Sequence, residues 1–443
     1  MLNPTQSEPV ALNRSLGPFM LWGLGVGLVI SGMYFGWNLG LEKGGTLGFA
    51  IATFFIIILY TTFTFSYTEL ACAIPKAGGA FDYAHKALGE KMGFICGIAQ
   101  IIEFVFAPPA IAAAIGAYFQ IYFPLVPSLF IAITAYVFFT ALNMMGVKLA
   151  ATFELVVTIF AVFELLLFAG VTLPHFNAAN FTKNALPHGY AGIFASIPFA
   201  IWFFLAIEGL ANLAEETIEP QKNIKKGFGW ALSTLVILCI LTFASAVGVD
   251  GWERIVYTPS GEPSDSPLPL ALSVIVGSNN LLYHLLIGIG LLGLIASFHG
   301  IILAAGRATY ELGRVGYFPA ILGKLHPSRK TPAFALVVNM LVGIVALLTG
   351  KTGEIITIAC MGALSLYIIS MISLFALRKN HPDMPRPFKV PFYPAFPAIA
   401  LVIAIIAFVS VCIYNPGLTL IYFGILGFTY AAYFWSLKRR NTP

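Results

Sequence analysis

The chain has 443 residues, of which 59% are hydrophobic and only 10% are charged, and its mean hydropathy is +0.88. A water-soluble globular domain carries about 25% charged residues, so this composition excludes that class and indicates an integral membrane protein. The net charge of +5 comes from lysines and arginines scattered between apolar runs, which excludes the basic face of a nucleic-acid-binding protein. The five cysteines lie inside apolar runs without metal-ligand spacing, so we expect no metal site and no cofactor.

Twelve segments are long and apolar enough to cross a bilayer as helices, which requires about 20 predominantly apolar residues each. They are 17–40, 46–73, 93–122, 126–146, 150–173, 189–214, 228–249, 283–306, 333–350, 354–377, 393–413 and 417–437. The longest break, 250–282, turns apolar at 268–276, which predicts an external loop with a short re-entrant or interfacial helix. We therefore expect an all-α integral membrane protein with 12 transmembrane helices, preceded by an N-terminal tail at 1–16.

Positive charge is distributed unequally between the loops that join these segments. If the N-terminus lies in the cytoplasm, 20 lysines and arginines fall on the cytoplasmic side, and only Lys43, Lys183, Arg254 and Lys351 fall on the other. Cytoplasmic loops of membrane proteins carry an excess of these residues. We therefore expect a multi-pass protein of the cell (inner) membrane with both termini in the cytoplasm.

The first segment is rich in glycine, with two possible meanings. Its GxxxG spacings, such as Gly23 to Gly27, are typical of close helix packing. Ser31 and Gly32, followed by a dense aromatic set, instead favour an unwound centre at about 31–36. Both interpretations stay open for any single glycine.

Three carboxylates lie inside the third and fifth segments. Glu154 is close to the cytoplasmic end of its segment, where we expect it to reach the polar headgroups. Glu103 and Glu164 lie deeper, where a charge costs roughly 2.5–3.5 kcal/mol. Each of these two is either a protonated acid in a helix–helix hydrogen bond or a group that handles a proton or an amine.

The sixth segment is interrupted around a carboxylate. Pro198 and Gly209 bracket Glu208 in a run that is otherwise apolar until Asn212. Such a charge must face a cavity or a partner, which makes Glu208 a candidate functional residue. Broken helices in segments one and six are typical of inverted-repeat transporters, in which the free carbonyls at a half-helix end attract a cation.

The eighth segment contains His299, with Ser297 and Gly300 as neighbours. A packed, hydrogen-bonded histidine is the favoured interpretation, and a proton relay is the alternative. The candidates for proton or ion coupling are therefore Glu103, Glu164, Ser297 and His299.

Four motifs occur in order across roughly residues 17–390. They are SGMYFGWN in a glycine-rich first helix, a P-x-x-GG-x-F-x-Y turn from Pro75 to Tyr83, an E-E-x-x-x-P run from Glu215 to Pro220, and R-x-x-Y-x-x-x-R-x-G-x-x-P from Arg307 to Pro319. This set resembles the amino acid–polyamine–organocation (APC) superfamily of transporters.

The resemblance implies a leucine-transporter-like fold. Its ten-helix core is a five-plus-five inverted repeat, here 17–390, with helices 1 and 6 discontinuous. Two additional transmembrane helices and a short basic tail occupy 391–443. Many sodium-independent members place a lysine in the fifth helix, whereas this chain has Ala161 nearby and Glu164 one turn on, so it departs from that pattern.

Within the family, WFFLAIEGLANLAEE looks most like the ethanolamine permease branch, because Ala206, Ile207 and Glu208 replace the usual glycine-phenylalanine-aspartate group of amino acid carriers. Ethanolamine carries an ammonium and no carboxylate, so its site needs net negative potential and favours cation–π contacts. The candidate substrate site comprises Glu208, Ile30, Ser31, Gly32, Tyr34, Trp37, Trp202, Phe203 and Phe204. An amino acid permease or exchanger is the alternative.

The expected mechanism is alternating access, with segments one and six clamping the ammonium at the midplane. Glu69, Lys86, Glu216 and Arg307 either latch the cytoplasmic gate or only anchor loops. The coupling ion stays open, with a proton favoured over sodium. A channel is less favoured because no repeated pore motif is visible, and a solute sensor on the same scaffold is a further, less favoured alternative. An enzyme is not expected, because the chain has no HExxH, paired-aspartate motif or nucleophile elbow, and no P-loop indicates an ATP-driven pump.

Overall fold

The computed structural model describes residues 14–145 and 150–440, apart from the side chains of 150, 151, 434 and 436–440. Within these ranges the regular structure is helical, and nine helices are long and apolar enough to cross a membrane. Three shorter apolar helices accompany them in the same ranges. The chain is therefore an all-helical, multi-pass membrane protein. Most of the expected N-terminal tail and Lys148 lie outside the described residues.

The helices follow one another along the chain with few long connections. In order they are α1 (Pro18–Val29), α2 (Ser31–Tyr34), α3 (Leu39–Ala73), α4 (Ala80–Leu88), α5 (Glu90–Tyr122), α6 (Ser128–Met145), α7 (Ala150–Thr172), η1 (Leu173–His175), α8 (Ala178–Thr182), α9 (Gly189–Ala195), α10 (Ile197–Trp202), η2 (Ile207–Glu216), α11 (Pro220–Asp250), α12 (Glu253–Val256), α13 (Pro267–Val276), α14 (Leu281–Arg314), α15 (Ala333–Leu347), α16 (Thr352–Asn380), α17 (Ala395–Tyr414) and α18 (Pro416–Arg440).

Each of the twelve predicted segments coincides with helical structure, but two of them are divided. The first segment corresponds to α1 and α2, and the sixth to α9, α10 and η2. The expected short helix in the break at 250–282 is α13. The number of membrane crossings and the inverted repeat stay predictions.

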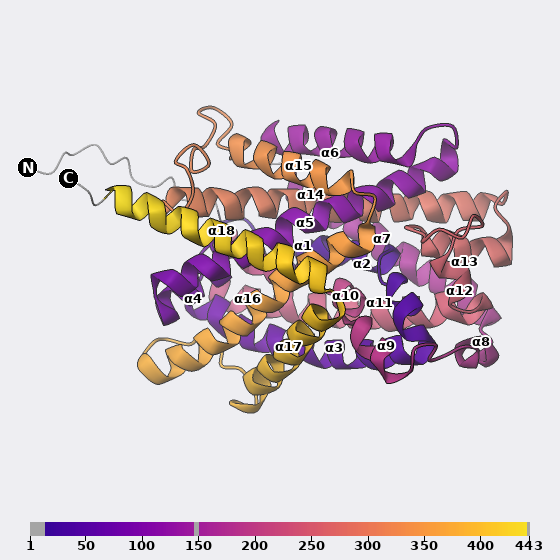
Figure 1. The fold of residues 1–443 in the computed structure, drawn as a ribbon, viewed down its shortest axis with the longest axis horizontal. Coiled ribbons are helices and arrows are strands. Elements are labelled where there is room, and N and C mark those ends of the chain that lie inside the picture. Colours follow the sequence, from indigo (N-terminus) through magenta and orange to yellow (C-terminus); the bar gives the residue numbers. More distant parts are fainter. Residues whose placement is uncertain (1–13, 146–149, 441–443) are drawn as a thin grey trace, which may run out of the picture.

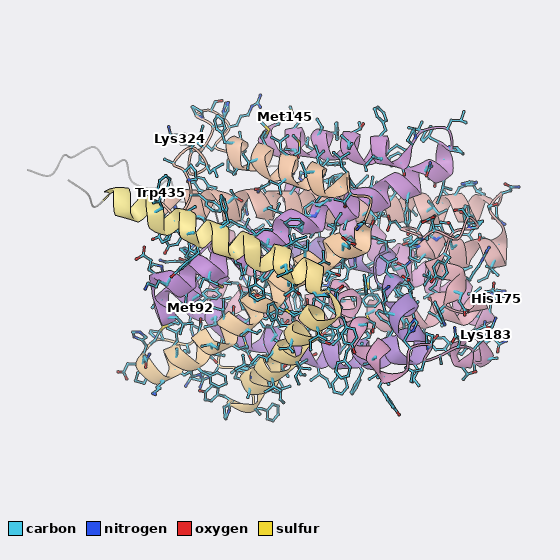
Figure 2. All side chains as sticks on the ribbon, in the orientation of Figure 1. Met92, Met145, His175, Lys183, Lys324 and Trp435 are labelled. Carbon is cyan, nitrogen blue, oxygen red and sulfur yellow. The ribbon has the colours of Figure 1, made fainter. Side chains whose placement is uncertain are left out.

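The helices form an elongated bundle in which both described chain ends lie at the same end (Figure 1). Figure 2 places Met92, Lys324 and Trp435 toward that end and His175 and Lys183 toward the other. We call the first the basic end, because the arginines at the C-terminal ends of α14 and α16 lie there. The other, which carries α8, α12 and α13, is the opposite end (Figure 1).

Helix α5 lies in the middle of the bundle and packs against α4, α6, α14, α15 and α16. Its side chains are mostly buried, whereas α6, α7 and α17 expose large apolar side chains such as Phe130, Phe160 and Val402. In water such surfaces would be costly to expose, but against lipid tails they are not. The outer helices therefore present the surface that a bilayer solvates.

The two divided helices meet where each is interrupted. Between α1 and α2 the chain stays in helical geometry at Ile30 (φ −59°, ψ −23°), and it leaves that geometry at Phe35 (φ −161°, ψ 173°) and Gly36 (φ 85°). The break therefore falls at the end of the predicted 31–36 stretch rather than throughout it. A Cβ on Gly32 would overlap the carbonyl oxygen of Trp202, the last residue of α10. Only glycine allows this backbone-to-backbone approach.

Candidate functional site

Glu208 lies in the interruption of the sixth predicted segment. After α10 ends, the chain passes through Ala206 in the left-handed region (φ 76°) and continues as the 3-10 helix η2, whose first turn carries Glu208. An alanine in this conformation costs roughly 1–2 kcal/mol, which the surrounding packing must offset. The Glu208 side chain is 1% exposed, and its Oε2 accepts a hydrogen bond of 3.0 Å from the Tyr367 hydroxyl of α16.

A second carboxyl group, Glu103 of α5, faces Glu208. The two side chains interact directly as a buried pair, and Glu103 is 0% exposed. Within the described residues, neither Glu103 oxygen nor Oε1 of Glu208 has a hydrogen bond of normal geometry. Two carboxylates buried side by side cannot both be ionised unless a cation compensates them. The pair can therefore bind one cation between its two carboxyl groups, either a proton or a larger cation.

Aromatic rings and hydroxyls surround this pair. The Tyr60 and Tyr367 hydroxyls lie 2.9 Å apart, which continues the hydrogen-bonded chain from Glu208 toward α3. The Phe204 ring lies 5.1 Å from that of Tyr60, and the Phe63 ring lies 4.2 Å from that of Tyr367. Ring faces attract cations, so this wall suits a positively charged ligand. We call the set Glu103, Glu208, Tyr60, Tyr367 and Phe204 the paired-carboxyl site.

Glu208, Glu103 and Phe204 are candidates from the sequence, whereas the sequence around Tyr367 indicates only a helix–helix contact and Tyr60 is not among the predicted site residues. A signal for Tyr60 exists, because Tyr60, Phe63 and Tyr67 recur at helical spacing on one buried face of α3. That pattern shows which face is buried, but it does not show that the face meets a carboxylate. Only the packing of α3 on α10 and α16 reveals this.

The residues near the first break contact α14 rather than Glu208. The Ser31 and Ser297 hydroxyls lie 2.8 Å apart, and the Ser297 hydroxyl donates a bond of 2.7 Å to the carbonyl of Leu28. Ile30 is fully buried at the turn between α1 and α2. Ser297 therefore fixes the α1–α2 turn against α14.

Tyr34 and Glu164 form a separate cluster. The Tyr34 hydroxyl donates a bond of 2.7 Å to Oε2 of Glu164, and the Tyr118 hydroxyl donates one of 3.1 Å to the Tyr34 carbonyl. A small cavity beside them is covered by Leu268 and Leu272 of α13. Glu164 of α7 thus has its own hydroxyl partner on α2. Side chains of α5 and α13 lie beside this pair.

Three aromatic residues of the predicted substrate site pack on other rings. Trp37 stacks on Phe203 with centroids 5.4 Å apart, meets Phe243 edge-on, and donates from its indole nitrogen to the Met33 carbonyl. Trp202 lies edge-on to Phe35. The structure therefore packs the rings of Trp37, Phe203 and Trp202 on other aromatic rings, and their part in substrate binding stays a prediction.

His299 and Glu154 occupy buried positions near α1. His299 Nδ1 lies 3.0 Å from the amide nitrogen of Asn143, which is the packed, hydrogen-bonded arrangement. The expectation that Glu154 reaches the headgroups is wrong, because its side chain is only 5% exposed and lines an internal cavity with Gly300 and Arg307. Helix α7 turns this residue toward α1 and α14 rather than toward lipid.

Two ion-pair clusters lie at the basic end. Arg307 and Glu216 form a salt bridge of 2.8 Å, and the backbones of Leu16 and Ile218 are joined beside it. Glu69 instead binds Arg378 through two bonds of 2.7 and 2.6 Å.

Arg386 and the amide of Val390 complete the Glu69 cluster. Lys86 is exposed on α4. The structure thus unites Glu216 with Arg307 but brings neither of them to Glu69 or Lys86.

At the opposite end, the segment before α13 is tied by hydrogen bonds to the end of the first interruption and to the start of α16. The Asn38 amide donates to the carbonyls of Ile255 (3.1 Å) and Ser264 (2.9 Å), which ties the end of the first interruption to this segment. Asp265 accepts a bond of 2.9 Å from the Thr352 hydroxyl at the start of α16. Burial raises the pKa of Asp265 to about 6, although the Thr352 hydroxyl opposes this shift.

This chain is similar to known transporters over most of its length. A family model described as amino acid permease matches residues 16–435. The chain is 30% identical to an uncharacterized transporter of Rhizobium meliloti (strain 1021), with 88% of this chain and 84% of the relative covered.

Two further relatives carry more specific names. The branched-chain amino acid permease BcaP of Bacillus subtilis (strain 168) is 27% identical over 87% of this chain and 85% of its own length. The low-affinity putrescine importer PlaP of Escherichia coli (strain K12) is 26% identical over 77% and 76%. The family and the named relatives are transporters.

Proposed function

Because this chain belongs to the amino acid permease family, within the APC superfamily, we propose that it is a secondary transporter of a small amine and that this amine is ethanolamine. The observation that carries the proposal is the buried pair Glu103 and Glu208 at the interrupted sixth segment. Its one compensating cation is a proton when the site is empty and the substrate ammonium when the site is loaded.

The surroundings of the pair favour an amine without a carboxylate. An amino acid zwitterion brings its own negative charge and needs a positive partner or free N–H groups. In the described ranges no lysine or arginine is among the buried residues, and the arginine side chain with little exposure, Arg386, is bound to Glu69 at the basic end. The paired-carboxyl site instead offers surplus acid and the rings of Tyr60 and Phe204, which suit an ammonium.

Alternating access is the mechanism that this arrangement supports. The two interruptions touch at Gly32 and Trp202, so a movement of one half-helix is passed to the other. The Arg307–Glu216 pair closes the basic end, which we assign to the cytoplasm, and Asp265 with Thr352 closes the opposite end. Opening one end at a time would expose the paired-carboxyl site to one side of the membrane.

An amino acid permease or exchanger is the second candidate. One relative is named for branched-chain amino acids and another for putrescine, an amine without a carboxylate. Backbone N–H groups at the first interruption could bind a substrate carboxylate.

Uptake of radiolabelled ethanolamine into proteoliposomes tests the choice between the two candidates. We expect competition by unlabelled small amines and little competition by leucine or serine. Saturable uptake of amino acids, with none of ethanolamine, would establish the amino acid alternative instead.

A further inference from the structure

A second buried carboxyl group lies between the paired-carboxyl site and the basic end. Glu154 of α7 lines a cavity of about 60 Å³ together with Gly209 of η2 and with Glu216 and Arg307. This volume holds more than one water molecule. The cavity thus extends from Gly209, the residue after Glu208 in η2, to the salt bridge between Arg307 and Glu216 at the basic end.

Two glycines make room for the Glu154 carboxyl group. A Cβ on Gly27 of α1 would lie 3.1 Å from its Oε1, and a Cβ on Gly300 of α14 would lie 2.9 Å from the same atom. Both distances are shorter than ordinary van der Waals contact with carbon. The carboxyl group is therefore held where the backbones of α1, α7 and α14 approach one another.

The carboxyl group is short of partners in this position. Its Oε1 is buried without a hydrogen bond, and so is the neighbouring hydroxyl of Thr158 on the same helix. An ionised carboxylate in such a place leaves its charge uncompensated, at a cost of several kcal/mol. The closed arrangement therefore suits the protonated acid.

Among the charged groups that face Glu154 from neighbouring helices, Arg307 favours a carboxylate there, but it is already paired with Glu216. Helix α1 carries no titratable side chain, and the lysines at the start of α11 are exposed. On α14, Arg307 is bound to Glu216 of η2, and His299 is bound to Asn143. Glu164, further along α7, is bound to Tyr34.

A proton fits this site better than a metal ion. Hard cations take about six oxygen ligands, whereas the unpartnered side-chain oxygens of Glu154, Thr158 and Asn212 are fewer than that. The nearby Ser297 hydroxyl is already donated to the Leu28 carbonyl. Within the described residues, no group of three histidine, cysteine or acidic side chains could hold a metal ion.

We propose that Glu154 is a proton-binding site that controls the gate at the basic end, an inference that rests on the proposed transport function. The protonated acid keeps α1 packed on α7 and α14 and the cavity narrow. Loss of the proton to water at the basic end creates a carboxylate that must be hydrated. Hydration widens the cavity and separates α1 from α14, which opens the passage toward Glu208.

Infrared difference spectroscopy of the purified full-length protein detects the proton directly. Beside the band of the proton that Glu103 and Glu208 share, we expect a further C=O band of a protonated buried carboxyl group that disappears as the pH is raised and is absent in Glu154→Gln. Glu164→Gln is the matched control on the same helix and should retain that band. If Glu154→Gln has the same pH-dependent spectrum as the wild type, the proposal is overturned.

Access to the cavity tests the gate. In Leu303→Cys, whose side chain lines the cavity, labelling by a polar maleimide should rise between about pH 6 and about pH 8 by more than the intrinsic rise in thiol reactivity. An exposed reporter, Ser328→Cys, gives that intrinsic rise.

When Glu154→Gln is combined with Leu303→Cys, the labelling should no longer rise with pH by more than it does in Ser328→Cys. Glu154→Asp in place of Glu154→Gln should restore this excess labelling. Excess labelling that persists in Glu154→Gln would overturn the proposal, as would excess labelling controlled by sodium chloride instead of pH. Neither assay uses a substrate, so failure of the transport proposal would show separately, as absent ethanolamine uptake.

Discussion

At the scale of single residues, the environment of each acidic group decides what it can do. Glu69 is neutralised by two arginines, and Glu164 has a tyrosine hydroxyl. Glu103, Glu208 and Glu154 are also buried, but each keeps at least one buried oxygen without a hydrogen bond in the described residues, although Glu208 also accepts a bond from the Tyr367 hydroxyl. A buried carboxyl group without a fixed partner needs a transient one. That difference, rather than burial alone, separates the functional candidates from the structural ones.

Substitution of Glu208 measures its contribution to binding. Glu208→Gln should weaken ethanolamine binding by roughly 10- to 150-fold, because it removes a charged partner worth about 1.5–3 kcal/mol. Tyr367→Phe should cost about fivefold, the effect of one neutral hydrogen bond. Glu354→Gln, whose salt bridge with Lys351 is exposed, is the control and should bind normally. Equal affinities of all three variants in a scintillation proximity assay would contradict the site.

Gly32 tests the contact between the two interruptions. Gly32→Ala places a Cβ against the carbonyl of Trp202 and should destabilise the protein by about 1–3 kcal/mol. Gly229→Ala is the matched control, because a Cβ there meets nothing within 4 Å and improves helix propensity. The melting temperatures in detergent should separate the two variants. Similar stabilities would show that the interruptions do not touch.

At the scale of helices, the sequence predicted the position of elements better than their partners. Length and apolarity located helical structure in all twelve segments, and Pro198 with Gly209 predicted the interruption around Glu208. The glycines of the first segment marked close packing at Gly32. These features are local, so a single chain segment reveals them.

Interhelical contacts could not be predicted in the same way. Glu103 and Glu208 are about a hundred residues apart, and no periodicity within α5 shows that it faces η2. The interpretation of Glu154 failed for a related reason. Its depth along the helix was estimated correctly as near one end, but its direction around the helix depends on the packing of α1 and α14.

The latch between η2 and α14 should control access from the basic end. Arg307→Ala removes the partly buried salt bridge with Glu216, worth about 1 kcal/mol, and should raise labelling of the Leu303→Cys reporter severalfold. Arg314→Ala removes an exposed arginine that pairs with Glu311 on the same helix, and it should leave labelling unchanged. Equal labelling in both variants would show that Glu216 and Arg307 only anchor loops and do not latch the gate.

At the scale of the whole molecule, closure at the two ends depends on different chemistry. The basic end is held by salt bridges and backbone bonds at Leu16, whereas the opposite end is held by amide and hydroxyl contacts of Asn38 and Thr352. Salt and pH should therefore act on the two ends differently. Asp265 is the group at the opposite end whose pKa is displaced far enough to matter near pH 6.

Asp265 should make stability depend on pH in a defined direction. The pKa of Asp265 is about 6 in the folded protein and 3.8 in the unfolded chain. At a pH between these two values, the folded state therefore binds more protons than the unfolded state. Stability therefore falls as pH rises from about 4 to about 6. Because water still reaches this half-buried side chain, we expect about 1–2 kcal/mol.

The comparison of Asp265→Asn with the wild type in thermal melts checks this expectation. The variant should lose that part of the pH dependence, and Glu262→Gln, an exposed neighbour, should keep it. The same slope in Asp265→Asn and the wild type would contradict the assignment.

The central claim is that Glu103 and Glu208 hold one cation between them. Calorimetric titration of the purified protein with ethanolamine, in buffers of different ionisation enthalpy, counts the protons released on binding. We predict about one proton released for each ammonium bound, because the ammonium displaces the shared proton, and no release in Glu103→Gln. Binding without proton release in the wild-type protein would contradict the account.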